Sequence, residues 1–153
     1  MTTLLAVGDV GVRRVDCASM FTGCAPVLRA ADAVFAQLET TVSERGARVP
    51  NARLAMRAPP AMLAAARAAG IGVMSFAGNH CLDWGYEAFD DTLVHAAAAG
   101  IALCGAGQTL AEARAPHVAQ VGDARIAFLA ASAILPEGYA AEPDRPGLSL
   151  IHI

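Results

Sequence analysis

Four polar residues of this 153-residue chain stand where apolar segments end: Asp9, Glu39, Asn79 and His80. Aspartate and glutamate provide anionic oxygens, asparagine a neutral oxygen, and histidine a nitrogen that titrates near neutral pH. Divalent metals need several such oxygen and nitrogen ligands, which usually come from different segments of a chain. If the apolar segments are neighbouring parallel strands, these side chains meet at one edge of a sheet, where open α/β folds bind their ligands.

The densest group of polar residues lies between positions 73 and 85. An apolar run over residues 73–77 leads into five closely spaced residues: Gly78, Asn79, His80, Asp83 and Gly85. A helix pattern follows at once, with Phe89 and Leu93 one turn apart. A strand that runs through Gly-Asn-His into a helix presents its polar side chains at the carboxyl edge of a sheet.

Each of these residues alone has a plainer interpretation. A Gly-Asp pair after a strand is most often a turn, and an Asn-His pair in a loop is commonly part of one as well. A glutamate at the end of a strand is most often solvated. The occurrence of Asp9, Glu39 and the Asn79–His80 pair after three separate predicted strands favours a functional site over three unrelated turns.

The motif also carries a resemblance to a known family. Residues 77–85, Ala-Gly-Asn-His-Cys-Leu-Asp-Trp-Gly, resemble the Asn-Asn-His-x-x-Asp-x-Gly signature of the CapA family of capsule and poly-γ-glutamate synthesis proteins, in the calcineurin-like metallophosphatase superfamily. Gly8-Asp9, Gln37-Leu38-Glu39 and Gly105-Ala-Gly107 also fall where that family has them. The resemblance implies an α/β fold with a metallophosphatase-like mixed sheet flanked by helices. Residues 1–147 would be an incomplete N-terminal portion of that domain.

The resemblance also implies roles for the residues that match the family pattern. Asp9 and Asn79 would be metal ligands, Glu39 a second or bridging ligand, and His80 the catalytic group that donates a proton or binds the substrate oxyanion. The cofactor would be a divalent metal (Mn, Zn or Fe), and the substrate an anionic small molecule or polymer. Asp83 is expected to cap a helix or to accept a hydrogen bond from a site residue. Trp84 is expected either to cover the site or to pack beside it.

Three departures from the family pattern lower the metal affinity that we expect. Gly78 stands where the family usually has asparagine, and Gly11 where many metallophosphatases have histidine. The downstream Gly-x-His and His-x-His patterns have no counterpart. We therefore expect metal binding to be weak or absent and phosphoesterase-like hydrolysis to be slow. The alternatives are a non-catalytic α/β module that binds an anionic ligand or polymer, and an incomplete domain whose uncovered strand edge invites aggregation.

Composition and charge exclude several other classes of protein. The net charge of −3 gives no electrostatic footprint for nucleic acid. No apolar run is long enough to span a bilayer, and the N-terminus has neither a basic segment nor a cleavage site. Four cysteines without a Cys-x-x-Cys pair are typical of a reducing compartment. A cytoplasmic location is therefore expected for this chain, although the resemblance implies that longer relatives are often membrane-associated.

The polar residues depend on alternating strands and helices for their positions. Strands are expected at residues 3–7, 33–38, 71–77 and 101–104, as a hairpin at 118–121 and 125–131, and as an edge strand at 53–57. Helices are expected at residues 26–31, from 60 to about 69, and at 86–99, where Phe89, Leu93 and Ala97 would face the core. A further short helix is expected after a capping box that begins at Thr109. Residues 148–153 match a translated sequencing adaptor and are expected to be an artefactual tail.

Overall fold

Four parallel strands form the central sheet in the computed structural model, which describes residues 1–11, 14–50, 52 and 54–151. Their order across the sheet is β1 (Leu4–Val10), β2 (Ala33–Leu38), β5 (Val73–Ser75) and β6 (Ala102–Cys104). Each neighbouring pair is parallel, which requires a crossover connection between successive strands. The predicted α/β class is confirmed.

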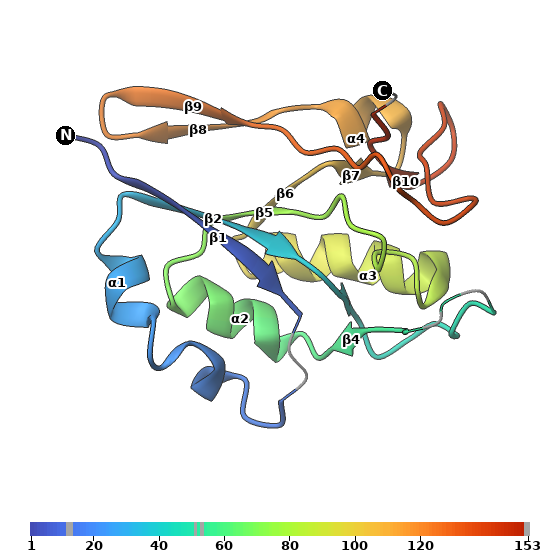
Figure 1. Ribbon diagram of the computed structural model, residues 1–153, viewed down its shortest axis with the longest axis horizontal. Coiled ribbons are helices and arrows are strands. Elements are labelled where there is room, and N and C mark those ends of the chain that lie inside the picture. Colours follow the sequence, from blue (N-terminus) through green and yellow to red (C-terminus); the bar gives the residue numbers. More distant parts are fainter. Residues whose placement is uncertain (12–13, 51, 53, 152–153) are drawn as a thin grey trace.

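One face of this sheet is covered by three helices (Figure 1): α1 (Ala25–Arg29), α2 (Ala61–Ala68) and α3 (Gly85–Ala98). Because side chains alternate along a strand, Val34, Ala36 and Leu38 of β2 share one face, and all three are almost fully buried. They belong to the main apolar cluster of the protein. In the same cluster, Phe76 and Phe89 stack with ring centroids 5.5 Å apart, which joins the end of β5 to α3.

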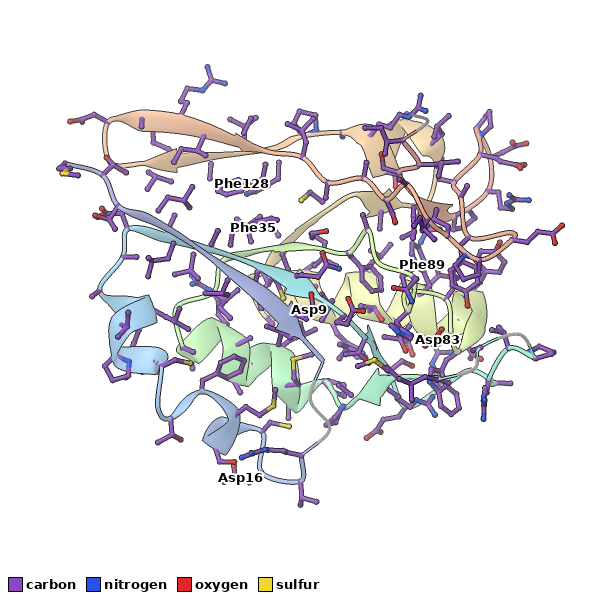
Figure 2. All side chains as sticks on the ribbon, in the orientation of Figure 1. Asp9, Asp16, Phe35, Asp83, Phe89 and Phe128 are labelled. Carbon is purple, nitrogen blue, oxygen red and sulfur yellow. The ribbon has the colours of Figure 1, made fainter. Side chains whose placement is uncertain are left out.

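A β-hairpin covers part of the opposite face (Figure 1). Its strands are β8 (His117–Val121) and β9 (Ala124–Phe128). Phe128 stacks on Phe35 of β2 at 5.6 Å between ring centroids (Figure 2), and Val73 and Cys104 complete a small second cluster. The predicted hairpin is therefore present, although its second strand ends at residue 128 and not at 131.

Shorter elements connect these layers: η1 (Ala18–Phe21), β3 (Thr41–Val42), β4 (Arg57–Ala58), β7 (Ala106–Gly107), α4 (Leu110–Arg114) and β10 (Gly147–Leu148). The 3₁₀ helix η1 begins next to Asp16, whose carboxylate accepts hydrogen bonds from the backbone amides of Ala18 and Ser19. Of the predicted edge strand at 53–57, Arg57 pairs with β3, residues 54–56 are not strand, and Arg53 lies outside the described residues. The predicted cap of α4 is present, since Thr109 Oγ1 accepts from the Glu112 amide at 3.2 Å.

The buried face of α3 differs from the predicted stripe. Ala97 is exposed, whereas Thr92 is fully buried between α3 and β3. The Thr92 hydroxyl donates to the Ala88 carbonyl at 2.7 Å and accepts from the Val42 amide at 2.8 Å. A polar side chain can therefore lie in the core, because its hydroxyl is satisfied. Within the described residues, no helix combines the length and apolar character needed to cross a bilayer.

Residues after position 147 take part in the fold. Leu148 is fully buried and pairs with Ala106 of β7, and the Ser149 amide donates to the Gly105 carbonyl at 2.9 Å. The Ile151 amide donates to the Ser132 carbonyl at 3.1 Å. These contacts describe how residues 148–151 pack; the artefactual origin suggested for residues 148–153 stays a prediction.

Candidate active site

The carboxyl ends of β1, β2 and β5 are neighbours and carry the predicted site residues (Figure 1). Asp9 lies inside β1, opposite Gln37 of β2, because β1 continues to Val10 and does not end at residue 7 as predicted. The Glu39 amide extends this pairing by donating to the Val10 carbonyl at 3.0 Å. Figure 2 shows Asp9 near this end of the sheet and Asp16 well away from it, beside η1.

Glu39 and His80 face each other at this edge. Glu39 Oε1 and His80 Nε2 are 3.9 Å apart, and the two side chains are 22% and 15% exposed. Partial burial raises the pKa of Glu39; the negative charges of Asp9 and Asp83 raise it further, whereas His80 lowers it. The structure therefore brings Asp9, Glu39 and His80 into one small polar region, and their chemical roles stay predictions.

A buried aspartate orients His80. Asp83 is 2% exposed, and its Oδ2 lies 2.6 Å from His80 Nδ1. Because an ionised carboxylate can only accept hydrogen bonds, Nδ1 carries the hydrogen and Nε2 is left on the side of Glu39. The other role predicted for Asp83, as a helix cap, is wrong: α3 begins after Trp84 and has no side-chain cap.

Two further groups that sequence reasoning missed hold the Asp83 carboxylate. The Met56 amide donates to Oδ2 at 3.0 Å, and the Tyr139 hydroxyl donates to Oδ1 at 3.4 Å. Burial raises the pKa of Tyr139, and the charge of Asp83 raises it further, so the hydroxyl keeps its proton for this bond. Met56 acts through its backbone and Tyr139 lies in a segment without periodicity, so neither carried a signal in the sequence.

Asn79 and Trp84 lie at the margin of this arrangement. Asn79 is exposed next to His80. Trp84 is half-buried and packs against Arg57, whose guanidinium carbon lies 4.1 Å from the indole ring centroid. The Trp84 Nε1 is buried and has no hydrogen-bond partner among the described residues. The observed contact of Trp84 is thus one of packing on an arginine at the edge of the site.

The two glycines that depart from the family pattern lie close to Glu39. A Cβ at Gly11 would be 2.8 Å from the Met56 methyl carbon and 3.1 Å from the Glu39 Cβ. There is therefore no room for a histidine at position 11 without movement of Met56. A Cβ at Gly78 would be 2.9 Å from the Gln37 amide nitrogen, which is the mobile end of a side chain and can give way. The Met56 methyl can also give way, but position 11 has the less mobile Glu39 Cβ at 3.1 Å as well, so position 78 accepts a larger residue more easily.

The side chains at this edge are of the types that bind a divalent cation, but there are few of them. Two neighbouring carboxylates, Asp9 and Glu39, lie near one imidazole, His80. Burial, and then the negative charges of Asp9 and Asp83, raise the pKa of Glu39, and a cation would offset both effects. Asn79 would add a neutral oxygen. Within the described residues, however, no three His, Cys, Asp or Glu side chains form a ready-made metal cage. These residues can contribute ligands, but they do not enclose an ion by themselves.

Comparison with known proteins places this chain in a family. Residues 3–149 match the family described as bacterial capsule synthesis protein PGA_cap. The chain belongs to this family. The resemblance to CapA proteins drawn from the motif at residues 77–85 is therefore confirmed.

Curated relatives are much longer than this chain. A protein of Mycobacterium tuberculosis named probable polyglutamine synthesis accessory protein is 36% identical over 126 residues, which are 80% of this chain and 33% of the relative. An uncharacterized protein of Sinorhizobium fredii is 30% identical over 99% of this chain and 36% of its own length. The PGA biosynthesis protein CapA of Bacillus subtilis is 26% identical over 85% of this chain and 35% of its own length. The chain spans about a third of each relative.

Proposed function

We propose that this chain provides part of the active site of a metal-dependent hydrolase that acts in the biogenesis of a capsule or poly-γ-glutamate-type polymer. The observation that carries the proposal is the meeting of Asp9, Glu39 and His80 at the ends of adjacent parallel strands, with His80 held by Asp83. The family match and the names of the Mycobacterium and Bacillus relatives support the link to polymer synthesis. Neither names a reaction for this chain, so the chemistry is argued from the site.

Each residue has a distinct part in this proposal. Asp9, Glu39 and Asn79 would hold a divalent metal (Mn, Zn or Fe), which when bound polarises the substrate and activates water. His80 would be protonated on both nitrogens, with the Asp83 carboxylate stabilising this imidazolium through Nδ1, and it would become neutral on passing its Nε2 proton to the leaving oxygen. Partial burial of Glu39 and His80 limits competing solvent.

The small number of ligands sets the expected affinity. Two carboxylates and one amide are few ligands for a first-row metal centre. We therefore expect metal binding by the 153-residue chain to be weak and its turnover low. An engineered Gly78→Asn, which requires the end of the Gln37 side chain to move, adds a further oxygen beside Glu39 and should tighten metal binding.

Metal titration combined with hydrolysis assays tests the proposal. The purified chain is stripped with chelator and titrated calorimetrically with Mn²⁺, and hydrolysis of p-nitrophenyl phosphate is followed at each metal concentration. Asp9→Ala should abolish metal binding and hydrolysis together, whereas His80→Ala should leave metal binding within about threefold and lower the rate at least 100-fold. Hydrolysis that persists in His80→Ala refutes the assigned role. Binding of an anionic ligand without any hydrolysis favours the non-catalytic module.

A further inference from the structure

A cleft of about 690 Å³ adjoins the candidate site, and the roles assigned above do not use it. It is lined by residues from the segments after β1 and β3, from around β4, and by Trp84. Two of its walls are shared with the site. The Met56 amide binds the Asp83 carboxylate, and Gly11 lies against Glu39. A ligand in this cleft would therefore lie beside the residues proposed for hydrolysis.

Arg57 lines this cleft as a cation held in place by neutral groups. Its guanidinium packs on the Trp84 ring at 4.1 Å, and its Nε donates to the Ser43 carbonyl at 2.8 Å. Its Nη2 donates to the Arg45 carbonyl. Among the ion pairs of the described residues, none includes Arg57. The guanidinium is thus fixed by an aromatic face and two carbonyls, and its charge is not neutralised by a carboxylate.

Other groups of the cleft also offer more donors than acceptors. The Trp84 Nε1 is buried and has no acceptor within the part of the chain that the structure describes. An unpaired buried N–H is unfavourable, so an incoming acceptor that reaches it adds stability. Arg14 lines the cleft as well, with Nη1 donating to the Ser19 hydroxyl at 3.3 Å. The lining residues include two arginines, Arg14 and Arg57, and one acid, Glu44, so they carry an excess of positive charge.

We infer that this cleft binds an oxyanion of an extended anionic chain, with Arg57 as its principal donor and Trp84 as the rigid support of Arg57. This inference rests on the proposed function, because it gives the polymer a place beside His80. A carboxylate and a phosphate both suit a fixed guanidinium, which can donate two parallel hydrogen bonds. The bound chain would continue from the cleft past Met56 towards Glu39 and His80.

Binding of short polyanions to the 153-residue chain tests this inference. Fluorescein-labelled γ-linked pentaglutamate is titrated by anisotropy, and unlabelled pentaglutamate and tripolyphosphate are compared as competitors. Trp84 is the only tryptophan of the chain, so its emission gives a second readout located in the cleft. Arg57→Gln should weaken binding at least about tenfold, the loss expected for a charge-assisted hydrogen bond. Stronger competition by tripolyphosphate would identify phosphate as the preferred oxyanion.

The control removes the same charge elsewhere. Arg125 lies on β9 of the hairpin, and Arg125→Gln should change affinity less than about twofold, as expected for a remote surface charge. Equal losses in Arg57→Gln and Arg125→Gln would overturn the inference, because they would report net charge alone. If circular dichroism shows that Arg57→Gln does not fold, Trp84→Leu decides: it removes the aromatic face that supports Arg57, and unchanged affinity in this variant overturns the inference.

Failure of the inference can be told apart from failure of the proposed function. If His80→Ala loses hydrolysis while Arg57→Gln binds and turns over the polyanion normally, the cleft is not the binding site although the hydrolase proposal stands. If no variant and no metal gives hydrolysis but Arg57→Gln loses binding, the cleft is confirmed as a polyanion site on a protein that is not a hydrolase.

Discussion

On the helix-covered face of the sheet, β2 presents Val34, Ala36 and Leu38 to α2 and α3, and these side chains are almost fully buried. One residue beyond Leu38, at the carboxyl edge, Glu39 is partly exposed and lies near other acids. The same strand therefore serves two regions with opposite character. Apolar contacts on the face stabilise the fold, whereas like charges at the edge oppose it, and such stored repulsion is typical of binding sites.

Phe89→Ala should give the largest effect on stability, because it removes apolar contacts on the helix-covered face of the sheet. Phe89 is fully buried and stacks on Phe76, so its truncation should lower the free energy of unfolding by about 3–5 kcal/mol. Urea unfolding followed by circular dichroism measures the loss. The matched control is Leu129→Ala at a side chain that is 67% exposed, which should change stability by less than about 0.5 kcal/mol. Similar losses in both variants would remove the contrast between face and surface.

Asp83→Asn tests the carboxyl edge of the sheet by removing the carboxylate that orients His80. The amide cannot stabilise an imidazolium as the carboxylate does, so the hydrolysis rate with p-nitrophenyl phosphate should fall about 100-fold or more. Tyr139→Phe, which removes only the longer hydrogen bond to Asp83, should lower the rate about threefold. A rate in Asp83→Asn equal to that of the unaltered chain would show that His80 does not need this partner.

Gly11→Ala tests how tightly the edge is packed. The new methyl would lie 2.8 Å from the Met56 methyl carbon and 3.1 Å from Glu39, so overpacking should cost about 1–2 kcal/mol of stability. Gly8, three residues earlier in β1, has nothing within 4 Å of such a methyl, and Gly8→Ala is the control, with an expected change below about 0.5 kcal/mol. Denaturant midpoints of the two variants compare them directly. Equal midpoints would mean that Met56 moves away freely.

Glu39→Gln should give the smallest effect, and it should raise stability, whereas Phe89→Ala and Gly11→Ala should lower it. Because the folded-state pKa of Glu39 lies above its ordinary value, folding binds protons here, and stability falls as pH rises through the folded-state pKa. Removal of the charge should raise the melting temperature at pH 7 by about 1–3 °C and leave it unchanged near pH 3. Thermal melts at both pH values measure this. A lower melting temperature at pH 7 would mean that Glu39 stabilises the fold as an anion.

Much of the fold was predictable because its signals are local. Alternation of apolar segments with helical patterns indicated the α/β class, and the capping box at Thr109 marked α4 correctly. The placement of Asp9 after a strand that ends at residue 7 was wrong, because pairing with Gln37 extends β1. Ala97 was wrongly placed inside: the buried face of α3 includes Thr92 and Ala96, and Thr92 can be buried because its hydroxyl is satisfied within the helix.

The sequence by itself determined that acids and an Asn-His pair follow successive strands, and parallel strand order then brings three of these residues to one edge. The expectation that Asp83 accepts a hydrogen bond from a site residue is met by His80, three positions away. Tertiary structure alone decided that Met56 and Tyr139 hold Asp83 and that Arg57 lies on Trp84. The physical reason is the separation along the chain over which sequence signals act. Periodicity and turn chemistry act over a few residues, whereas most of these contacts join segments 27 to 56 positions apart, where no local pattern records the partner.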